Sequence, residues 1–175
     1  VTLNFPSPIG TRYFSRTTIP WVEFNAAPPL SQGVGYMKLV LASASPRRAE
    51  LLQQIGVEFD ICAVDIDETP WINEEPEDYV KRVALEKARA AHALPVNKNL
   101  LTLGADTSVI VGGQILGKPS NEEDAIGMLQ KLSGVTHSVL TAVALIGKDE
   151  ACIINESRVT FRVLSEQEMH RYWAT

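Results

Sequence analysis

From residue 37 onward, the chain alternates apolar runs of strand length with segments in which apolar residues recur at helical spacing. Because helices separate the early strands whereas tight turns join the later ones, the pattern predicts an α/β domain with a mixed central sheet flanked by helices. We expect strands at 38–42, 57–64, 100–105, 108–111, 137–146 and 151–163, and helices at 46–55, 76–92, 121–132 and from 165 to the end of the sequence.

Individual residues predict where helices begin and where strands turn. Ser45 is suited to cap the first helix, because Pro46 follows at the first helical position, where its missing N–H costs nothing. Ser165, with Glu168 three residues later, has the pattern of a capping box for the last helix. The pair Gly112 and Gly113 follows an apolar run and predicts a hairpin turn.

Residues 1–36 differ from the rest of the chain in composition. They hold three of the 37 charged residues, but five of the ten prolines and six of the twelve aromatic residues. They show no helical period, and the prolines would interrupt most strands. A transit peptide is disfavoured because no amphipathic arginine face is present, and the apolar core of a secretory signal is missing. We therefore expect 1–36 to be a poorly structured extension outside the fold, and 37–175 to form the domain.

Charge and cysteine content narrow the classes of function. With 16 basic and 21 acidic side chains the net charge is −5, so no overall cationic field attracts nucleic acid or an anionic membrane. No apolar run reaches the ~18 residues of a membrane span. The two cysteines stand 90 positions apart and fit a reducing compartment better than a disulfide framework. We expect a cytoplasmic protein without nucleic-acid or membrane partners.

Two arginines occupy an unfavourable place in the first helix. Arg47 and Arg48 lie in its first turn, where the helix dipole disfavours each cation by ~0.3–1 kcal/mol. An anion such as phosphate, held by backbone N–H groups, both guanidiniums and the hydroxyls of Ser43 and Ser45, would remove the conflict. A solvated basic helix end explains the same residues, and the local pattern does not decide between the two interpretations.

Carboxylates in two later segments are further candidates for metal ligands or proton acceptors. Asp106 directly follows an apolar strand, where a carboxylate can hold a metal or accept a proton from water, although such a residue also commonly opens a turn. The acidic loop with Asp65, Asp67 and Glu68 offers the oxygen ligands of a hard cation such as Mg²⁺. Taken alone, a solvated acidic loop is the simpler interpretation.

Residues 112–120 nearly match the phosphate-binding loop G-x-x-x-x-G-K-[ST]. Pro119 stands where a hydroxyl would bind magnesium and has no N–H to donate, so we do not interpret 112–120 as this phosphate-binding loop. Lys118 remains either a single phosphate contact or an exposed turn lysine. The three histidines do not have the spacing of zinc ligands.

Six ordered segments together resemble the Maf nucleotide pyrophosphatases, over residues 37–175. The segments are 41–52 (LASASPRRAELL), 67–70 (DETP), 86–88 (EKA), 104–107 (GADT), 117–119 (GKP) and 132–137 (LSGVTH). The resemblance implies the fold of inosine triphosphate pyrophosphatases, with two lobes around a cleft. It also implies hydrolysis of a nucleoside triphosphate to the monophosphate and pyrophosphate with a divalent cation, Mg²⁺ or Mn²⁺.

The resemblance also implies roles for single residues. Asp106 resembles the family's proton acceptor, and Glu68 resembles an acidic residue of the catalytic or metal shell, so both are candidate metal ligands. The paired arginines and the GADT segment resemble the branch acting on dTTP and UTP, with Arg47 and Thr107 at its specificity positions. The residues that match those holding the triphosphate are Ser43, Arg47, Arg48 and Lys118.

The family pattern continues past the position of Thr175 with a segment resembling G-E-P-x-D-K-A-G-x-Y-x-I-Q-G, which is absent here. The resemblance therefore implies a domain that lacks its C-terminal part, with weak or absent activity. Two alternatives stay open: a pyrophosphatase for modified purine nucleotides or 7-methyl-GTP, and a non-catalytic regulator of septum formation. Because members of the family often form homodimers, a homodimer is also an expectation.

Overall fold

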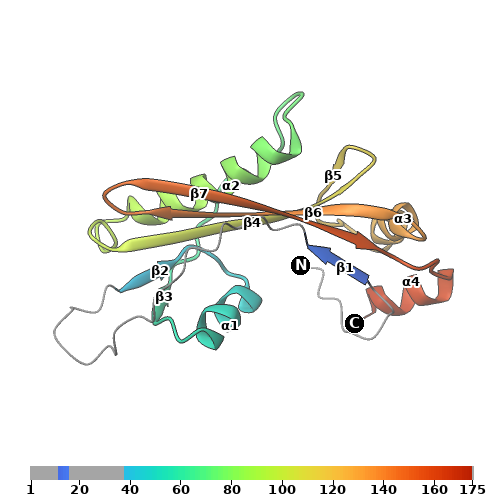
Figure 1. Ribbon diagram of the computed structural model, residues 1–175, viewed down its shortest axis with the longest axis horizontal. Helices are drawn as coiled ribbons and strands as arrows, with labels where there is room; N and C mark the ends of the chain where they lie inside the picture. Colours follow the sequence, from blue (N-terminus) through green and yellow to red (C-terminus); the bar gives the residue numbers. More distant parts are fainter. Residues whose placement is uncertain (1–11, 16–37, 175) are drawn as a thin grey trace.

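The computed structural model describes residues 12–15 and 38–174, and its centre is a mixed seven-stranded sheet (Figure 1). The strands follow the spatial order β1-β7-β6-β4-β2-β3, and β5 pairs with β4 alone. Their bounds are β1 Arg12–Ser15, β2 Leu39–Leu41, β3 Phe59–Ile61, β4 Leu101–Val111, β5 Gln114–Leu116, β6 Thr136–Ile146 and β7 Glu150–Thr160. Only β2 pairs in parallel, with β3 on one side and β4 on the other, and the remaining pairs are antiparallel.

Four helices accompany the sheet: α1 Pro46–Gln54, α2 Pro76–His92, α3 Glu122–Leu132 and α4 Glu166–Trp173. In Figure 1, α2 lies above the long strands, α1 lies below them beside β2 and β3, and α3 and α4 lie together at the opposite end. This arrangement agrees with the expected mixed sheet flanked by helices. No helix in the described part of the chain is long and apolar enough to cross a membrane.

Helix α2 supplies the main core by packing on β4 and β6. Its apolar face meets alternate residues of β6, and a nine-residue cluster is buried between them. Gly104 of β4 lies so close to α2 that a Cβ atom there would stand 2.4 Å from the carbonyl oxygen of Ala84. The buried residues are Tyr79, Val80, Val83, Ala84, Ala88, Leu140, Ala142, Ala144 and Ile146.

Several expected elements differ from the structure in their extent. β4 is one continuous strand, although two were predicted at 100–105 and 108–111. The intervening Asp106 and Thr107 pair with Ala142 and Thr141 of β6, so cross-strand pairing continues the strand through these polar residues. β3 is shorter than the predicted 57–64, and β7 ends three residues before the predicted 163.

The predicted caps and turns are largely confirmed. α2 spans the predicted 76–92, the capping box at the start of α4 is present, and β4 turns into β5 at Gly112 and Gly113. Both glycines have positive φ, 56° and 77°, which this type of hairpin turn requires. Ser45 occupies the N-cap position of α1, but its side chain makes no capping hydrogen bond.

The expectation that residues 1–36 lie wholly outside the fold is wrong at β1. The backbone of Arg12–Ser15 pairs antiparallel with β7, from Thr160 to Ser157. Without β1, the outer edge of β7 would present unpaired backbone N–H and C=O groups, to which an extended segment can bind through its own backbone. Because backbone groups alone make this pairing, the side chains of the added strand need no particular hydrophobic pattern. The other residues of the segment lie outside the described part of the chain, so their predicted poor order is untested.

Candidate functional site

The turn between β2 and α1 brings Ser43 and Arg48 together. The Ser43 hydroxyl oxygen accepts hydrogen bonds from the backbone N–H of Ser45, at 3.2 Å, and from Nη1 of Arg48, at 3.0 Å. Burial lowers the pKa of Arg48, and the negative charges of Asp106 and Glu68 act in the opposite direction. Because a guanidinium stays protonated under any ordinary condition, the turn presents a permanent cation to the cleft that Asp106 and Glu68 also line.

Arg47 lies differently from its neighbour. Its side chain is 53% exposed, and its Nη1 is 3.3 Å from Oε2 of Glu50 on the same helix. It therefore lies at the edge of the site, free to change partner when an anion arrives, since exposed pairs of this kind contribute little stability.

Two carboxylates are joined through one buried lysine. Nζ of Lys87, on α2, lies 3.0 Å from Oδ1 of Asp106 and 3.0 Å from Oε1 of Glu68. Oδ2 of Asp106 accepts a hydrogen bond from the Ser108 hydroxyl at 3.1 Å, so both oxygens of this carboxylate are oriented. Asp106 and Lys87 are both buried, and the charges of this group are therefore weakly screened.

Glu68 also reaches Lys118, 50 residues further along the chain. The distance from Oε2 of Glu68 to Nζ of Lys118 is 3.5 Å. Partial burial raises the pKa of the Glu68 carboxyl, but hydrogen bonds and charge from Lys87 and Lys118 outweigh this effect, and the net pKa lies below its usual value. Glu68 is therefore an anion at neutral pH, placed between two ammonium groups.

Lys87 is the residue that the sequence reasoning missed as a site residue. Lys87 stands at helical spacing with Val80, Val83, Ala84 and Ala91, and the structure buries all five on one face of α2. The overlooked signal is the charge on that face, because a lysine is almost never fully buried unless it is paired. A buried lysine on the core face of α2 requires an acidic partner, and Lys87 has two, Asp106 and Glu68.

Thr107 points away from the carboxylates. Successive side chains of a strand alternate between faces, so Thr107 lies on the opposite face of β4 from Asp106. Its hydroxyl is 3.2 Å from that of Thr141 on β6. The two threonines present a pair of hydroxyls that can donate and accept hydrogen bonds.

A large cleft of about 1450 Å³ connects these residues. Its walls come from both ends of the molecule, with α1 on one side and residues of α3 and α4 on the other. The volume is ample for a ligand of nucleotide size. Among the polar residues that line it are Ser43, Arg47, Arg48, Glu68, Lys87, Asp106, Thr107 and Lys118.

The site fits a metal ion only when another ligand supplies oxygen atoms. Among residues 38–174 no group of three or more histidine, cysteine or acidic side chains is gathered closely enough to hold a metal. Asp67 caps its own loop by accepting a hydrogen bond from the N–H of Thr69 at 2.9 Å. Glu68 and Asp106 remain, and Mg²⁺ is commonly held by one or two carboxylates together with substrate phosphates.

Comparison with known proteins finds one matching family and several close relatives. The family model described as Maf-like protein matches residues 38–175. A dTTP/UTP pyrophosphatase of Hahella chejuensis is 51% identical over 142 residues, which is 79% of this chain and 70% of that protein. A dTTP/UTP pyrophosphatase of Myxococcus xanthus is 50% identical over 134 residues, 77% of this chain and 67% of that protein.

A solved structure supports the fold independently of close sequence similarity. The HAM1 protein of Coxiella burnetii aligns with a TM-score of 0.50 at 16% identity, over 70% of this chain and 71% of that one. At this identity the likeness concerns the fold, a mixed sheet with helices around a cleft.

Proposed function

Because the chain belongs to the Maf-like protein family, we propose that it hydrolyses dTTP and UTP to the nucleoside monophosphate and pyrophosphate. The observation that carries the proposal is the Asp106–Lys87–Glu68 group, in which Glu68 also contacts Lys118 and which lines the same cleft as Arg48. A carboxylate that can accept a proton, surrounded by fixed cations, suits the attack of water on a phosphorus atom.

In this proposal the cations bind and orient the triphosphate. Arg48 is already held by Ser43, and Arg47 and Lys118 are exposed enough to turn toward a ligand. The N-terminal end of α1 adds its partial positive charge. Together these groups stabilise the negative charge that develops on the phosphoryl oxygens.

Asp106 accepts the proton of the attacking water. Lys87 and Ser108 each orient one of its oxygens, and each oxygen retains a further lone pair for the water. Attack on the α-phosphorus releases pyrophosphate and leaves the monophosphate. Glu68 and Asp106 would hold a divalent cation, Mg²⁺ or Mn²⁺, which when bound compensates phosphate charge and fixes the geometry.

The base-recognition residues are part of the same proposal. Arg47 and Thr107 match the specificity positions of the branch acting on dTTP and UTP, and the Thr107–Thr141 hydroxyl pair offers hydrogen bonds to a pyrimidine edge. The cytoplasm remains the expected location, and a homodimer remains the expected assembly.

The proposal is tested with a panel of dTTP, UTP, ITP and 7-methyl-GTP in the presence of Mg²⁺ or Mn²⁺, with pyrophosphate and monophosphate as the products measured. We expect kcat/KM for dTTP and UTP to exceed that for the purine nucleotides by at least about tenfold. A preference for ITP or 7-methyl-GTP would favour the purine alternative. Nucleotide-dependent thermal stabilisation without any product would favour a non-catalytic regulator.

A further inference from the structure

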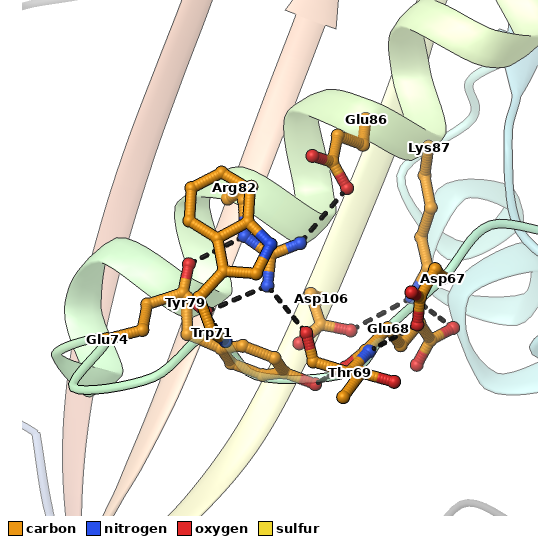
Figure 2. A network of polar contacts seen from close by, with 10 residues as sticks. All are labelled: Asp67, Glu68, Thr69, Trp71, Glu74, Tyr79, Arg82, Glu86, Lys87 and Asp106. Atoms are coloured by element: carbon orange, nitrogen blue, oxygen red, sulfur yellow. Dashed lines mark hydrogen bonds and ion pairs between the residues drawn. The ribbon is translucent and has the colours of Figure 1, made fainter.

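Arg82, an arginine of α2 outside the cleft, makes several contacts with the loop that follows Glu68 (Figure 2). Arg82 holds Glu74 with two hydrogen bonds, Nε to Oε1 at 2.6 Å and Nη2 to Oε2 at 2.8 Å. Its Nη2 also donates to the carbonyl oxygen of Thr69 at 3.1 Å, and its Nη1 donates to Glu86 at 3.2 Å. The planar guanidinium therefore joins both ends of the loop to the helix.

Arg82 is also covered by an aromatic ring. Its guanidinium carbon lies 4.3 Å from the centre of the Trp71 ring and 5.5 Å from that of Tyr79. The side chains of Arg82 and Glu74 are only 10% and 5% exposed. Loss of one partner of such a shielded ion pair leaves the other charge without compensation, which is strongly unfavourable.

Two side chains of α2 bind consecutive carbonyl oxygens at Glu68 and Thr69. The carbonyl oxygen of Glu68 itself accepts a hydrogen bond from the Tyr79 hydroxyl at 2.9 Å, and the carbonyl oxygen of the next residue, Thr69, is the one bound by Arg82. Tyr79 and Glu68 line the cleft, whereas Arg82 does not. Arg82 therefore acts on the site through the residues that it contacts, and its bond to the Thr69 carbonyl links it to the loop directly beside Glu68.

Hydrophobic burial does little to hold this loop. Trp71 is 64% exposed and Ile72 is 94% exposed, and Asn73 has a positive φ of 59°. The loop is instead held by polar contacts: the Trp71 N–H donates to Glu74, the Thr69 carbonyl oxygen accepts from Arg82, and the side chains of Arg82 and Glu74 are paired.

We propose that Arg82 is a positioning residue that sets Glu68 at its place between Lys87 and Lys118 by fixing the loop from Thr69 to Glu74. The inference rests on the proposed function, because it assigns Arg82 a part in the same reaction. A displacement of about 1 Å at a catalytic group can cost about 100-fold in rate, so a distant clamp of this kind matters for turnover.

A double-mutant cycle with Glu68→Gln tests whether Arg82 acts through Glu68. We expect Arg82→Ala to lower kcat for dTTP by about 10- to 100-fold while KM changes by less than about threefold, because the arginines at α1 stay in place. In the Glu68→Gln background the same change should cost less than about twofold, since the residue that it positions is already inactive. Glu74→Gln should show the same non-additivity.

The matched control is Arg89→Ala, seven residues further along α2. Arg89 also forms a two-pronged ion pair, with Glu150, but it is 53% exposed and bonds no residue of the loop. We expect kcat of the Arg89→Ala variant to stay within about twofold of wild type, because exposed ion pairs contribute little stability. Equal losses from Arg82→Ala in both Glu68 backgrounds would overturn the inference, as would an unchanged kcat.

Hydrogen exchange by mass spectrometry provides a readout that does not depend on activity. In Arg82→Ala, peptides covering 66–75 should exchange at least about tenfold faster, while peptides from α2 and β4 and all peptides of Arg89→Ala keep the wild-type rate. Unchanged exchange in 66–75, or faster exchange throughout the chain, would overturn the inference. A wild-type chain inactive on all four nucleotides would reject the proposed function, and exchange would still decide the role of Arg82.

Discussion

In the cleft, anionic and cationic side chains alternate along a chain of contacts, from Asp106 to Lys87, Glu68 and Lys118. Lys87 lies between the carboxylates of Asp106 and Glu68, and Glu68 in turn lies between Lys87 and Lys118. Removal of any one charge therefore changes the environment of its neighbours, and effects of substitutions within this group will not be additive.

Asp106→Asn should abolish the reaction while the chain still folds and binds nucleotide. Asparagine keeps the shape of the side chain but does not accept the proton of water, so we expect kcat to fall by about 10²- to 10⁴-fold. Asp60→Asn is a suitable control, because Asp60 forms only an exposed pair with Lys38. Turnover of Asp106→Asn within threefold of wild type would refute the assignment of Asp106 as proton acceptor.

Part of this site could be predicted from the sequence because local physics singles it out. Two arginines at the positive end of a helix are an electrostatic conflict, and Arg48 lines the same cleft as Asp106 and Glu68, where burial lowers its pKa and the charges of these two carboxylates act in the opposite direction. The role of Lys87 could not be obtained in this way, because its partners lie 19 residues away on each side. A helical period shows that a residue is buried but does not show which distant residue it meets.

At the level of helices and strands, the contact between α2 and β4 leaves no room for a larger side chain at Gly104. The chain approaches so closely at Gly104 that a methyl group would also stand 2.7 Å from the backbone nitrogen of Ala88. Because both neighbours are backbone or short side chains, neither can move aside without shifting the helix.

Gly104→Ala should therefore destabilise the protein, by about 1–3 kcal/mol or more, as expected for overpacking. Gly127→Ala is the matched control, for which we expect the opposite effect on stability. Gly127 lies inside α3, where a Cβ atom would meet no atom within 4 Å, and alanine favours the helical conformation. We expect it to stabilise the protein by about 0.5–1 kcal/mol. Urea denaturation of both variants measures these changes, and equal stability of the two would contradict the packing at α2.

The start of α4 should respond to acid. Hydrogen bonds from Arg162 and from Ser165 lower the pKa of Glu168 to about 2, against an ordinary value of 4.5. Because the folded-state pKa is depressed, the stabilisation is complete above pH 4.5 and is lost as pH falls toward about 2.

Thermal melts across a pH series check this expectation. The difference in Tm between wild type and Glu168→Gln should be constant from pH 7 to about pH 5 and should shrink below that. A difference that stays the same at pH 3.5, or one that grows as the solution becomes more acidic, would show that Glu168 does not stabilise the fold as an anion.

The elements themselves were predictable where local signals agree. α2 combines a helical period, a proline at its first position and acidic residues in its first turn, and its predicted bounds are correct. β4 was divided because Asp106 and Thr107 break the apolar run, and only pairing with β6 restores the continuity. β1 depends entirely on the edge of β7, which no local pattern reveals.

Considered as a whole, the molecule is acidic, but several of its cations lie together in one cleft. The net charge is −5, yet Arg47, Arg48, Lys87 and Lys118 all line one cleft. The fold assembles them from α1, α2 and the segment after β5, and the two carboxylates come from a loop and a central strand. Such a cleft suits an anionic substrate that also brings a divalent cation.

Hydrolysis in H₂¹⁸O tests the central claim most directly, because it shows which phosphorus atom the water attacks. With dTTP or UTP and Mg²⁺, we predict that the heavy oxygen appears in the nucleoside monophosphate and not in the pyrophosphate, as seen by mass spectrometry of both products. Label in the pyrophosphate, or a nucleoside diphosphate with free phosphate as the products, would contradict the claim that this cleft directs water to the α-phosphorus.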